Sequence, residues 1–128
     1  MTTPAKYQAK YISRHTIMAR HRWESPEYRI QLNQCAIQKV SADADKLAVY
    51  VAAGDDDHLR VTTPHRAPDA WVYGVYDSGE REMRFHVGTP PIEAVGWGDG
   101  DVVVVEETDL PETIAIRRVE RGGAEADD

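Results

Sequence analysis

The sequence predicts a mainly β protein: a small interlocked β-barrel of two fused strand–turn–strand–strand units with short helical turns. Three observations predict this fold. The 128-residue chain repeats its apolar pattern at a shift of 55 positions, several short segments alternate apolar and polar residues, and four consecutive valines follow a glycine-rich stretch. Alternation is typical of half-buried strands, whereas a continuous β-branched run indicates a strand that is buried on both faces.

The repeat aligns residues 28–63 with residues 83–118 without a gap. Apolar positions coincide in four segments: YRIQLN falls on MRFHVG, IQKV on IEAV, LAVYV on VVVVE, and LRVTT on IAIRR. Because all four matches share one register, we interpret the chain as duplicated. Each unit then reads strand, helical turn, strand, loop and strand.

The second unit shows this order most clearly. Met83–Val87 alternates and predicts a half-buried strand. Pro90 and Pro91 suit the entry to a helical turn, where a missing N–H does no harm, and Ile92 and Val95 are spaced to share one face of that turn. We expect the equivalent residues of the first unit to form the same elements.

The glycine-rich stretch GWGDG, residues 96–100, follows the predicted turn. Glycine allows positive φ, and the side chains of Asp99 and Asp101 can accept hydrogen bonds from nearby backbone amides. We therefore expect the chain to reverse here and to enter a rigid strand, Val102–Val105, that is covered on both faces. Leu47–Ala53 is its apolar counterpart in the first unit.

Five segments follow from this pattern. They are a basic N-terminal arm or strand pair (1–27), the first unit (28–63), a connector with one aromatic strand, Trp71–Tyr76 (64–82), the second unit (83–119) and a disordered acidic tail (120–128). The two units, 28–119, are expected to form one compact domain.

The composition limits the class of protein. No apolar run approaches the roughly 18 residues of a membrane helix, and the first residues lack the pattern of a signal peptide. We therefore expect a cytoplasmic protein without a membrane partner. Cys35 is the single cysteine, which excludes an internal disulfide, and we expect it to be partly buried.

The charge is distributed unevenly. Residues 1–40 carry seven Lys and Arg against two Glu, a net charge of +5, and the remaining residues carry eight against twenty, a net of −12, which together give −7. Such asymmetry suggests a basic arm for a polyanion on an acidic body. The alternative is adaptation to high salt, because eleven Arg to four Lys with many Asp is the composition expected of a GC-rich halophilic microbe.

The second unit resembles the AbrB/MazE-like swapped-hairpin family. Gly96-Trp97, Gly100-Asp101 and the valines that follow them carry the resemblance, whereas the first unit has Asp45-Lys46 where the family has Gly-Asp. The resemblance implies two hairpin-exchanging units in one barrel and DNA binding as a transcription regulator or antitoxin. It also implies basic DNA-facing residues on the first strand and the following turn. Arg29, Lys39 and Arg84 keep that character, but the second turn has Glu93 in place of a cation.

The strongest polyanion signal is the stretch Lys6–Trp23, where cations alternate with aromatic residues that could stack on bases. Arg29 and Arg84 are equivalent in the repeat and could project as a pair toward a DNA groove. The predicted nucleic-acid-binding residues are Lys6, Lys10, Arg14, Arg20, Arg22, Arg29, Lys39 and Arg84. The alternative is that the basic stretch serves solubility and that both arginines form surface salt bridges.

No catalytic, metal or cofactor site is predicted. His15, His21 and Glu24 are not spaced to bind one metal ion, and the acidic stretch Asp55–His58 reads as a solvated hairpin loop. No nucleophile with a positioned base is identifiable. We predict a DNA-binding regulator rather than an enzyme. The alternative function is a protein-interaction module, antitoxin-like or an adaptor, that uses the acidic surface and Trp71–Tyr76 to bind a protein partner or to self-associate.

Overall fold

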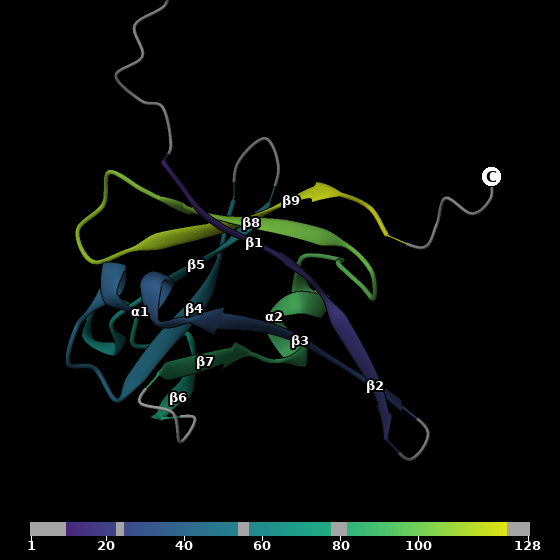
Figure 1. The fold of residues 1–128 in the computed structure, drawn as a ribbon, viewed down its shortest axis with the longest axis horizontal. Coiled ribbons are helices and arrows are strands. Elements are labelled where there is room, and N and C mark those ends of the chain that lie inside the picture. Colours follow the sequence, from purple (N-terminus) through teal and green to yellow (C-terminus); the bar gives the residue numbers. More distant parts are fainter. Residues whose placement is uncertain (1–9, 23–24, 54–56, 78–81, 123–128) are drawn as a thin grey trace, which may run out of the picture.

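The computed structural model describes residues 10–22, 25–53, 57–77 and 82–122. Within them, strands dominate and the helices are short (Figure 1). In chain order the elements are β1 (Tyr11–Thr16), β2 (Met18–Arg22), β3 (Ser25–Asn33), α1 (Gln34–Val40), β4 (Lys46–Ala52), β5 (His58–Thr62), the 3-10 helix η2 (Pro64–Arg66), β6 (Trp71–Asp77), β7 (Met83–Val87), α2 (Thr89–Ala94), β8 (Val102–Glu107) and β9 (Ile114–Glu120).

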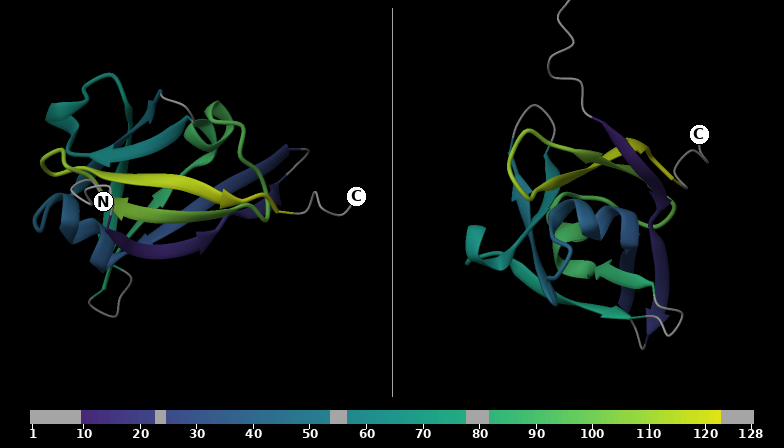
Figure 2. Two further views of the ribbon diagram at one scale, coloured as in Figure 1. Left: turned by 90° about the horizontal axis from the view of Figure 1, so that it is seen from above. Right: turned by 60° about the vertical axis from the view of Figure 1, so that its left-hand side comes forward.

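The described strands form one nine-stranded antiparallel sheet in the order β1-β8-β9-β5-β4-β6-β7-β3-β2. Only the buried Ile17 separates β1 from β2 in the chain, so the two ends of this order belong to one bent strand. Strand β1 pairs with β8 and strand β2 pairs with β3, rather than with each other. The bent strand thereby joins the two edges, and the sheet curls into the barrel seen in Figure 2.

Strand pairs between the two units follow an approximate two-fold axis. In the β3–β7 pair, Ile30 lies opposite Val87 and Leu32 lies opposite Phe85, with Gln31 opposite His86 at the centre. Gln31 and His86 are 55 positions apart, so they are equivalent residues of the two units. The shift of 55 positions therefore turns the Ile30–Val87 pair into the Phe85–Leu32 pair. The β5–β9 pair has the same symmetry, with Arg60 opposite Ala115 at its centre. Leu59 lies opposite Ile116, and Val61 lies opposite Ile114.

The strand that precedes each unit also pairs with strands of both units. The bent β1–β2 strand pairs with β3 of its own unit and with β8 of the other unit. Strand β6 likewise pairs with β7 of its own unit and with β4 of the other. Each half therefore inserts strands into the other, which confirms the predicted interlocked barrel of two fused units.

The core lies inside the barrel and includes both helical turns. Phe85 is its largest fully buried side chain, and Ile37 of α1 and Ile92 of α2 join the same cluster. Burying a side chain of this kind contributes about 1.5–3 kcal/mol. Figure 1 shows α1 and α2 at separate places along the barrel.

The valine strand is covered on both faces, as the sequence predicts. Val103 and Val105 point into the core, where neither is exposed. Val104 points outward between its cross-strand neighbours Arg14 and Arg117, yet only 7% of it is exposed. Long arginine side chains cover apolar neighbours with their aliphatic stems. The outer face of this ribbon is therefore shielded by cations rather than by a second layer.

The glycine-rich stretch fastens the second unit to the bent strand. Gly96 and Gly100 have positive φ values of 76° and 85°, which suit glycine. The Gly100 N–H donates to the carbonyl of Ile17 at 2.9 Å, and the Ile17 N–H donates to the carbonyl of Asp101 at 2.8 Å. The stretch thus reverses the chain and also holds the point at which β1 bends into β2.

Asp101 organises this turn from a buried position. Its carboxylate accepts hydrogen bonds from the Gly98 N–H at 2.9 Å and the Gly122 N–H at 2.7 Å, and it forms an ion pair with Arg118 at 3.2 Å. Only 4% of Asp101 is exposed. Lys46 is its equivalent in the first unit, so this arrangement exists in one half only.

Candidate nucleic-acid interface

The centre of the candidate interface is the outer face of the β3–β7 pair. Ile30 and Leu32 point into the core, so the alternating Arg29 and Gln31 point outward. On β7 the inward residues are Phe85 and Val87, which turns Arg84 and His86 outward. The two arginines therefore lie on one face, on opposite sides of the Gln31–His86 pair.

His86 connects the residues of this face. Arg29 Nη1 lies 3.5 Å from His86 Nδ1, while His86 Nε2 lies 3.1 Å from Gln31 Oε1 and 3.0 Å from Tyr76 Oη. A guanidinium can only donate, so Nδ1 accepts and this network assigns the imidazole proton to Nε2. The Tyr76 and His86 rings also meet edge to face, with centroids 5.3 Å apart.

The pKa of His86 is lowered from its ordinary value. Burial is the larger cause, and the positive charges of Arg29 and Arg84 add to it. Both causes disfavour a second proton on the imidazole. At neutral pH the face therefore carries the charges of two arginines around an uncharged histidine.

The two arginines differ in their carboxylate partners. Arg84 Nη2 forms an ion pair with Glu82 at 3.3 Å, and Arg84 Nε is buried without a hydrogen-bond partner among the described residues. Arg29 has no carboxylate partner within the described part of the chain, and its guanidinium contacts His86 instead. Arg29 is therefore the more available of the two cations for an external anion.

A shallow hollow of about 300 Å³ adjoins Arg29. Its lining also includes Gln31 of β3, His15 and Thr16 of β1, and Met18 at the bend of the strand. Burial lowers the pKa of His15, whose Nε2 lies 2.8 Å from Ser13 Oγ. The hollow thus presents hydrogen-bonding groups and one guanidinium next to the Gln31–His86 pair.

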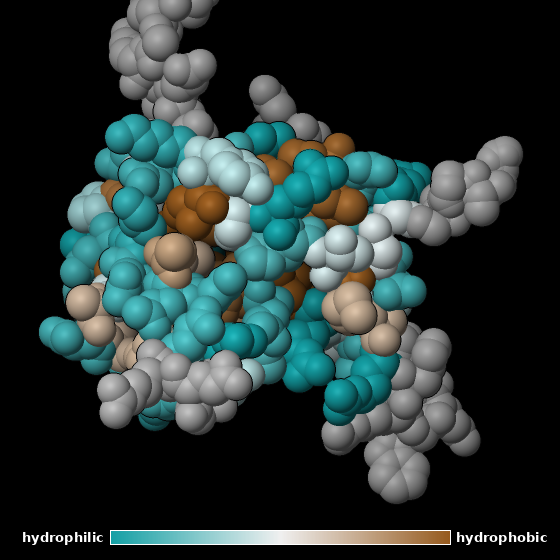
Figure 3. Space-filling model, viewed as in Figure 1, coloured by the Kyte–Doolittle hydropathy of each residue, from teal (hydrophilic) through white to brown (hydrophobic). Residues whose placement is uncertain are grey.

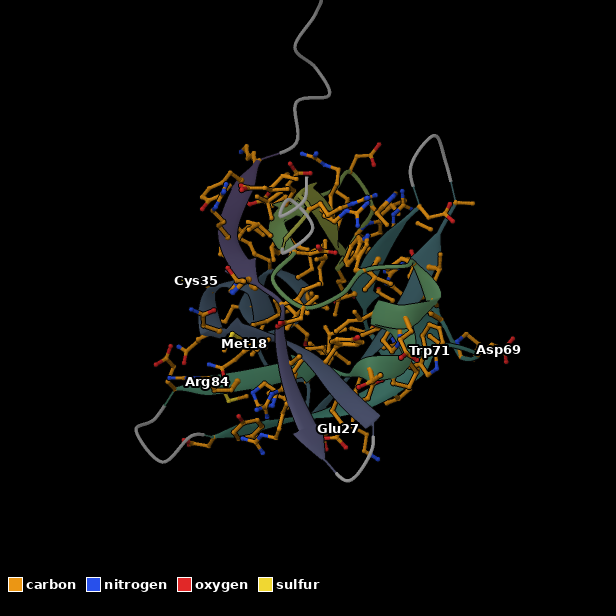
Figure 4. The ribbon with its side chains drawn as sticks, turned by 90° about the vertical axis from the view of Figure 1, so that its right-hand side faces the viewer. Met18, Glu27, Cys35, Asp69, Trp71 and Arg84 are labelled. Atoms are coloured by element: carbon orange, nitrogen blue, oxygen red, sulfur yellow. The ribbon has the colours of Figure 1, made fainter. Side chains whose placement is uncertain are left out.

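Arg20 of β2 is close to this face, because it lines a second pocket together with Arg29. It is exposed and forms no ion pair with any residue that the structure describes. Figure 4 shows the β2–β3 hairpin in front of the sheet, with Met18 at its base, Glu27 farther along it, and Arg84 on the neighbouring β7. Arg20, Arg29 and Arg84 are thus gathered around β2, β3 and β7.

The other predicted residues lie elsewhere. Arg14 of β1 pairs with Glu120 at 3.3 Å, and Lys39 of α1 pairs with Glu107 at 2.9 Å. The hydrogen bond from Lys39 is the main cause that lowers the pKa of Glu107, and Lys10 adds a smaller attraction. Lys6 and the side chain of Arg22 lie outside the described residues. Arg14 and Lys39 thus lie on other elements than Arg20, Arg29 and Arg84.

Figure 3 shows the face around β1, β3 and β8 as largely hydrophilic, with separate small hydrophobic patches. A polar outer face of this kind suits a charged partner better than a large apolar one.

Sequence reasoning missed Gln31, Tyr76 and His86. Gln31 and His86 are themselves 55 positions apart, so the repeat contained the signal that could have paired them. Tyr76 belongs to the connector, and its contact with His86 depends on the pairing of β6 with β7. No sequence pattern specifies that pairing.

The described residues contain neither a metal-binding cluster nor a helix that could cross a membrane. They contain no group of three or more His, Cys, Asp or Glu side chains that could hold a metal ion. Their helices are all too short to cross a membrane. Cys35, in the first turn of α1, is exposed, which corrects the expectation that it is partly buried (Figure 4). Its side chain points away from the core side of α1, which Ala36, Ile37 and Val40 occupy.

Comparisons with protein-family models, curated proteins and solved structures found no match to this chain.

Proposed function

We propose that this protein binds nucleic acid, as a DNA-binding transcription regulator of the AbrB-like type. The contact surface is the outer face of β2, β3 and β7. The observation that carries the proposal is the placement of Arg29 and Arg84 on opposite sides of the Gln31–His86 pair. The approximate two-fold axis that relates the two units passes through this pair. Duplex DNA has approximate two-fold symmetry of its own, and symmetric DNA-binding proteins match it.

The chemistry of this face supports contacts to phosphates. Guanidinium groups donate to phosphate oxygens in a bidentate manner, and such contacts fix the orientation of a protein on the duplex. Gln31 is exposed beside Arg29, and its amide is a group that can reach base edges. The resemblance of the second unit to the AbrB/MazE-like family supports the same function.

The ion pairs limit the strength of the interaction. Arg14, Lys39 and Arg84 each have a carboxylate partner, so an incoming phosphate must compete with Glu120, Glu107 and Glu82. No ion pair joins Arg20 or Arg29 to a carboxylate among the described residues, although Glu27 lies opposite Arg20 across the β2–β3 pair. We therefore propose about three phosphate contacts, which correspond to a slope of about −3 in a plot of log K against log salt.

In this proposal the protein acts in the cytoplasm, and its acidic composition serves solubility. Protein self-repulsion and solubility depend on net charge, whereas the contact to DNA depends on the local cluster of arginines. An overall charge of −7 is therefore compatible with a small cationic contact face.

Fluorescence anisotropy with a labelled generic duplex tests the proposal. Binding is expected at about 50 mM salt and should weaken by more than tenfold at about 200 mM. The double variant Arg29→Gln, Arg84→Gln should bind at least tenfold more weakly. Arg66→Gln is the matched control, since Arg66 is an exposed arginine of η2 that pairs with Glu112. Equal binding by all three proteins, or no binding at low salt, would contradict the proposal.

A protein-interaction module is the second candidate. It is favoured by the exposure of β6, where Trp71, Val72 and Tyr76 are 36%, 43% and 44% exposed. Aromatic side chains of this kind are enriched at protein interfaces. A pull-down from native extract separates the two candidates: a defined protein that is retained by the natural chain and lost with Val72→Asp supports the module, whereas co-purified nucleic acid supports DNA binding.

A further inference from the structure

A pocket of about 560 Å³ lies beside the β2–β3 hairpin, and Arg29 is one of its lining residues. Its walls come from β2, β3, β6 and the beginning of α2, and we call it the Tyr73 pocket after its most buried aromatic residue; Met18, Arg20, Tyr28, Arg29, Tyr73 and Thr89 are among its lining residues. Pockets of about 300–1,000 Å³ are the usual size of small-molecule sites. The nucleic-acid proposal makes no use of this space.

The charge of the pocket favours an anion. Arg20 and Arg29 both line it, and Glu27 is the one carboxylate among its lining residues. Glu27 lies directly opposite Arg20 across the β2–β3 pair, so these two charges offset one another. Arg29 then leaves a net positive charge in the pocket, which is the charge that recognises a carboxylate or a phosphate.

The rest of the wall is apolar and aromatic. Met18, Tyr28 and Pro90 are among its lining residues. The Tyr73 ring packs edge to face on Phe85 of the core, with centroids 6.1 Å apart. A flat apolar group fits such walls, because aromatic rings prefer stacked or edge-on neighbours.

The Tyr73 hydroxyl is a hydrogen-bonding group without a well-formed bond among the described residues. Burial raises the pKa of Tyr73, and the nearby backbone of Gly88 offsets part of that effect without completing a well-formed hydrogen bond. Gly88 lets the Tyr73 ring pack closely here, since a Cβ at this position would lie only 3.2 Å from the Tyr73 oxygen. Buried hydroxyls normally have a partner, but this oxygen has almost no exposed surface, so it shapes the wall of the pocket rather than offering a contact to a ligand.

The wall is held in place before any ligand arrives. Thr89 Oγ1 accepts a hydrogen bond from the Tyr28 N–H at 2.9 Å and donates one to the Tyr28 carbonyl at 3.3 Å. This pair of bonds ties β3 to the beginning of α2 across the pocket. A rigid wall lowers the entropy cost of binding.

We propose that the Tyr73 pocket binds a small organic anion with one aromatic ring. The carboxylate or phosphate group is held by Arg29 with help from Arg20, and the ring lies against Met18 and Tyr28. The site is independent of the nucleic-acid proposal except that both use Arg20 and Arg29.

Two-dimensional amide NMR of the full chain tests this site with phenyl phosphate as the probe and benzyl alcohol as its uncharged match. Phenyl phosphate should cause saturable shifts at the amides of Ala19, Tyr28, Gly88 and Thr89, and benzyl alcohol should bind at least tenfold more weakly. A benzoate titration then distinguishes a carboxylate from a phosphate. No saturation by either anion up to about 10 mM, or equal binding of the uncharged match, would overturn the proposal.

Variants show whether the arginines are responsible. Arg29→Gln should weaken phenyl phosphate binding at least tenfold and Arg20→Gln a few-fold, with the dispersion of the amide spectrum confirming that both variants are folded. Arg66→Gln is the matched control and should leave the affinity unchanged. Arg84 does not line the pocket, so Arg84→Gln should keep the probe affinity even if it lowers affinity for DNA. Loss of probe binding in Arg84→Gln, or full binding in Arg29→Gln, would contradict the assignment.

Discussion

Gln34 and Thr89 are equivalent residues of the two units and make the same hydrogen bond in opposite directions across the β3–β7 pair. Thr89 Oγ1 accepts from the Tyr28 N–H at 2.9 Å, and Gln34 Oε1 accepts from the Met83 N–H at 3.1 Å. Tyr28 and Met83 are themselves equivalent, so each helix begins by fastening the first strand of the other unit. A glutamine and a threonine thus do the same work, because each provides the hydrogen-bond acceptor for a partly buried backbone N–H.

Replacing Thr89 by valine tests this link. Thr89→Val keeps the shape of the side chain but removes its oxygen, so the Tyr28 N–H loses its partner. The free energy of unfolding should fall by about 1–3 kcal/mol, the cost of an unpaired, partly buried amide. Thr89→Ser keeps the hydroxyl and should retain most of the stability in urea unfolding. Equal stability of the valine and serine variants would show that the bond contributes nothing.

Gly96 and Gly98 provide a matched pair for the conformation of the glycine-rich stretch. A Cβ added at either position has no atom within 4 Å, but only Gly96 has a positive φ, of 76°. Gly96→Ala should therefore destabilise the protein by about 1–2 kcal/mol. Gly98→Ala should be neutral or stabilising by up to about 1 kcal/mol, because it restricts the unfolded chain. Thermal unfolding of both variants checks the difference, and a similar cost at both positions would refute this account.

Asp101 is expected to be the most sensitive position of the turn. Asp101→Ala removes the acceptor for the Gly98 and Gly122 N–H groups and leaves Arg118 without its partner. We expect a loss of about 3 kcal/mol, since breaking a buried pair leaves its partners unsatisfied. Asp109→Ala is a suitable control, because Asp109 is exposed in the β8–β9 loop. A loss below about 1 kcal/mol in chemical denaturation would contradict this role of Asp101.

Stability should depend on pH through His86. Its folded pKa is lowered by burial and by the two neighbouring arginines, whereas in the unfolded chain it is near 6.5. Above about pH 6.5 the histidine is neutral in both the folded and the unfolded state, so it does not change the free energy of unfolding. As the pH falls below 6.5, the unfolded chain binds the proton first, so the free energy of unfolding decreases until the folded pKa is reached.

Urea unfolding at pH 7.5 and pH 5.5 measures this effect. The decrease between the two values should be smaller in His86→Gln than in the natural protein. Some decrease should remain, because burial also lowers the pKa of His15. His65→Gln is the control, since His65 is exposed in η2. An unchanged pH dependence in His86→Gln would rule out the proposed contribution of His86.

Arg29 belongs to both the proposed DNA contact surface and the Tyr73 pocket. An anion held in the Tyr73 pocket neutralises Arg29 and should therefore weaken DNA binding, whereas the uncharged benzyl alcohol should not.

The sequence by itself determined the elements and their buried faces. The shift of 55 positions, the alternation in Met83–Val87 and the β-branched run Val102–Val105 predict strands of the right kind in the right order. Gly96 and Gly100 predict the reversal before β8, and both have the positive φ that makes glycine suitable. These features are local, since backbone preference and side-chain alternation act within a few residues.

The tertiary structure alone decided how the elements meet. The bend at Ile17 lets one strand close the barrel by pairing with β8 and β3, and no local pattern specifies either partner. The ion pair of Arg14 with Glu120 spans 106 positions, and the placement of Tyr76 against His86 depends on the pairing of β6 with β7. The physical reason is that alternation states which side of a strand is buried, whereas closure of the whole barrel sets which strands are neighbours and in which register.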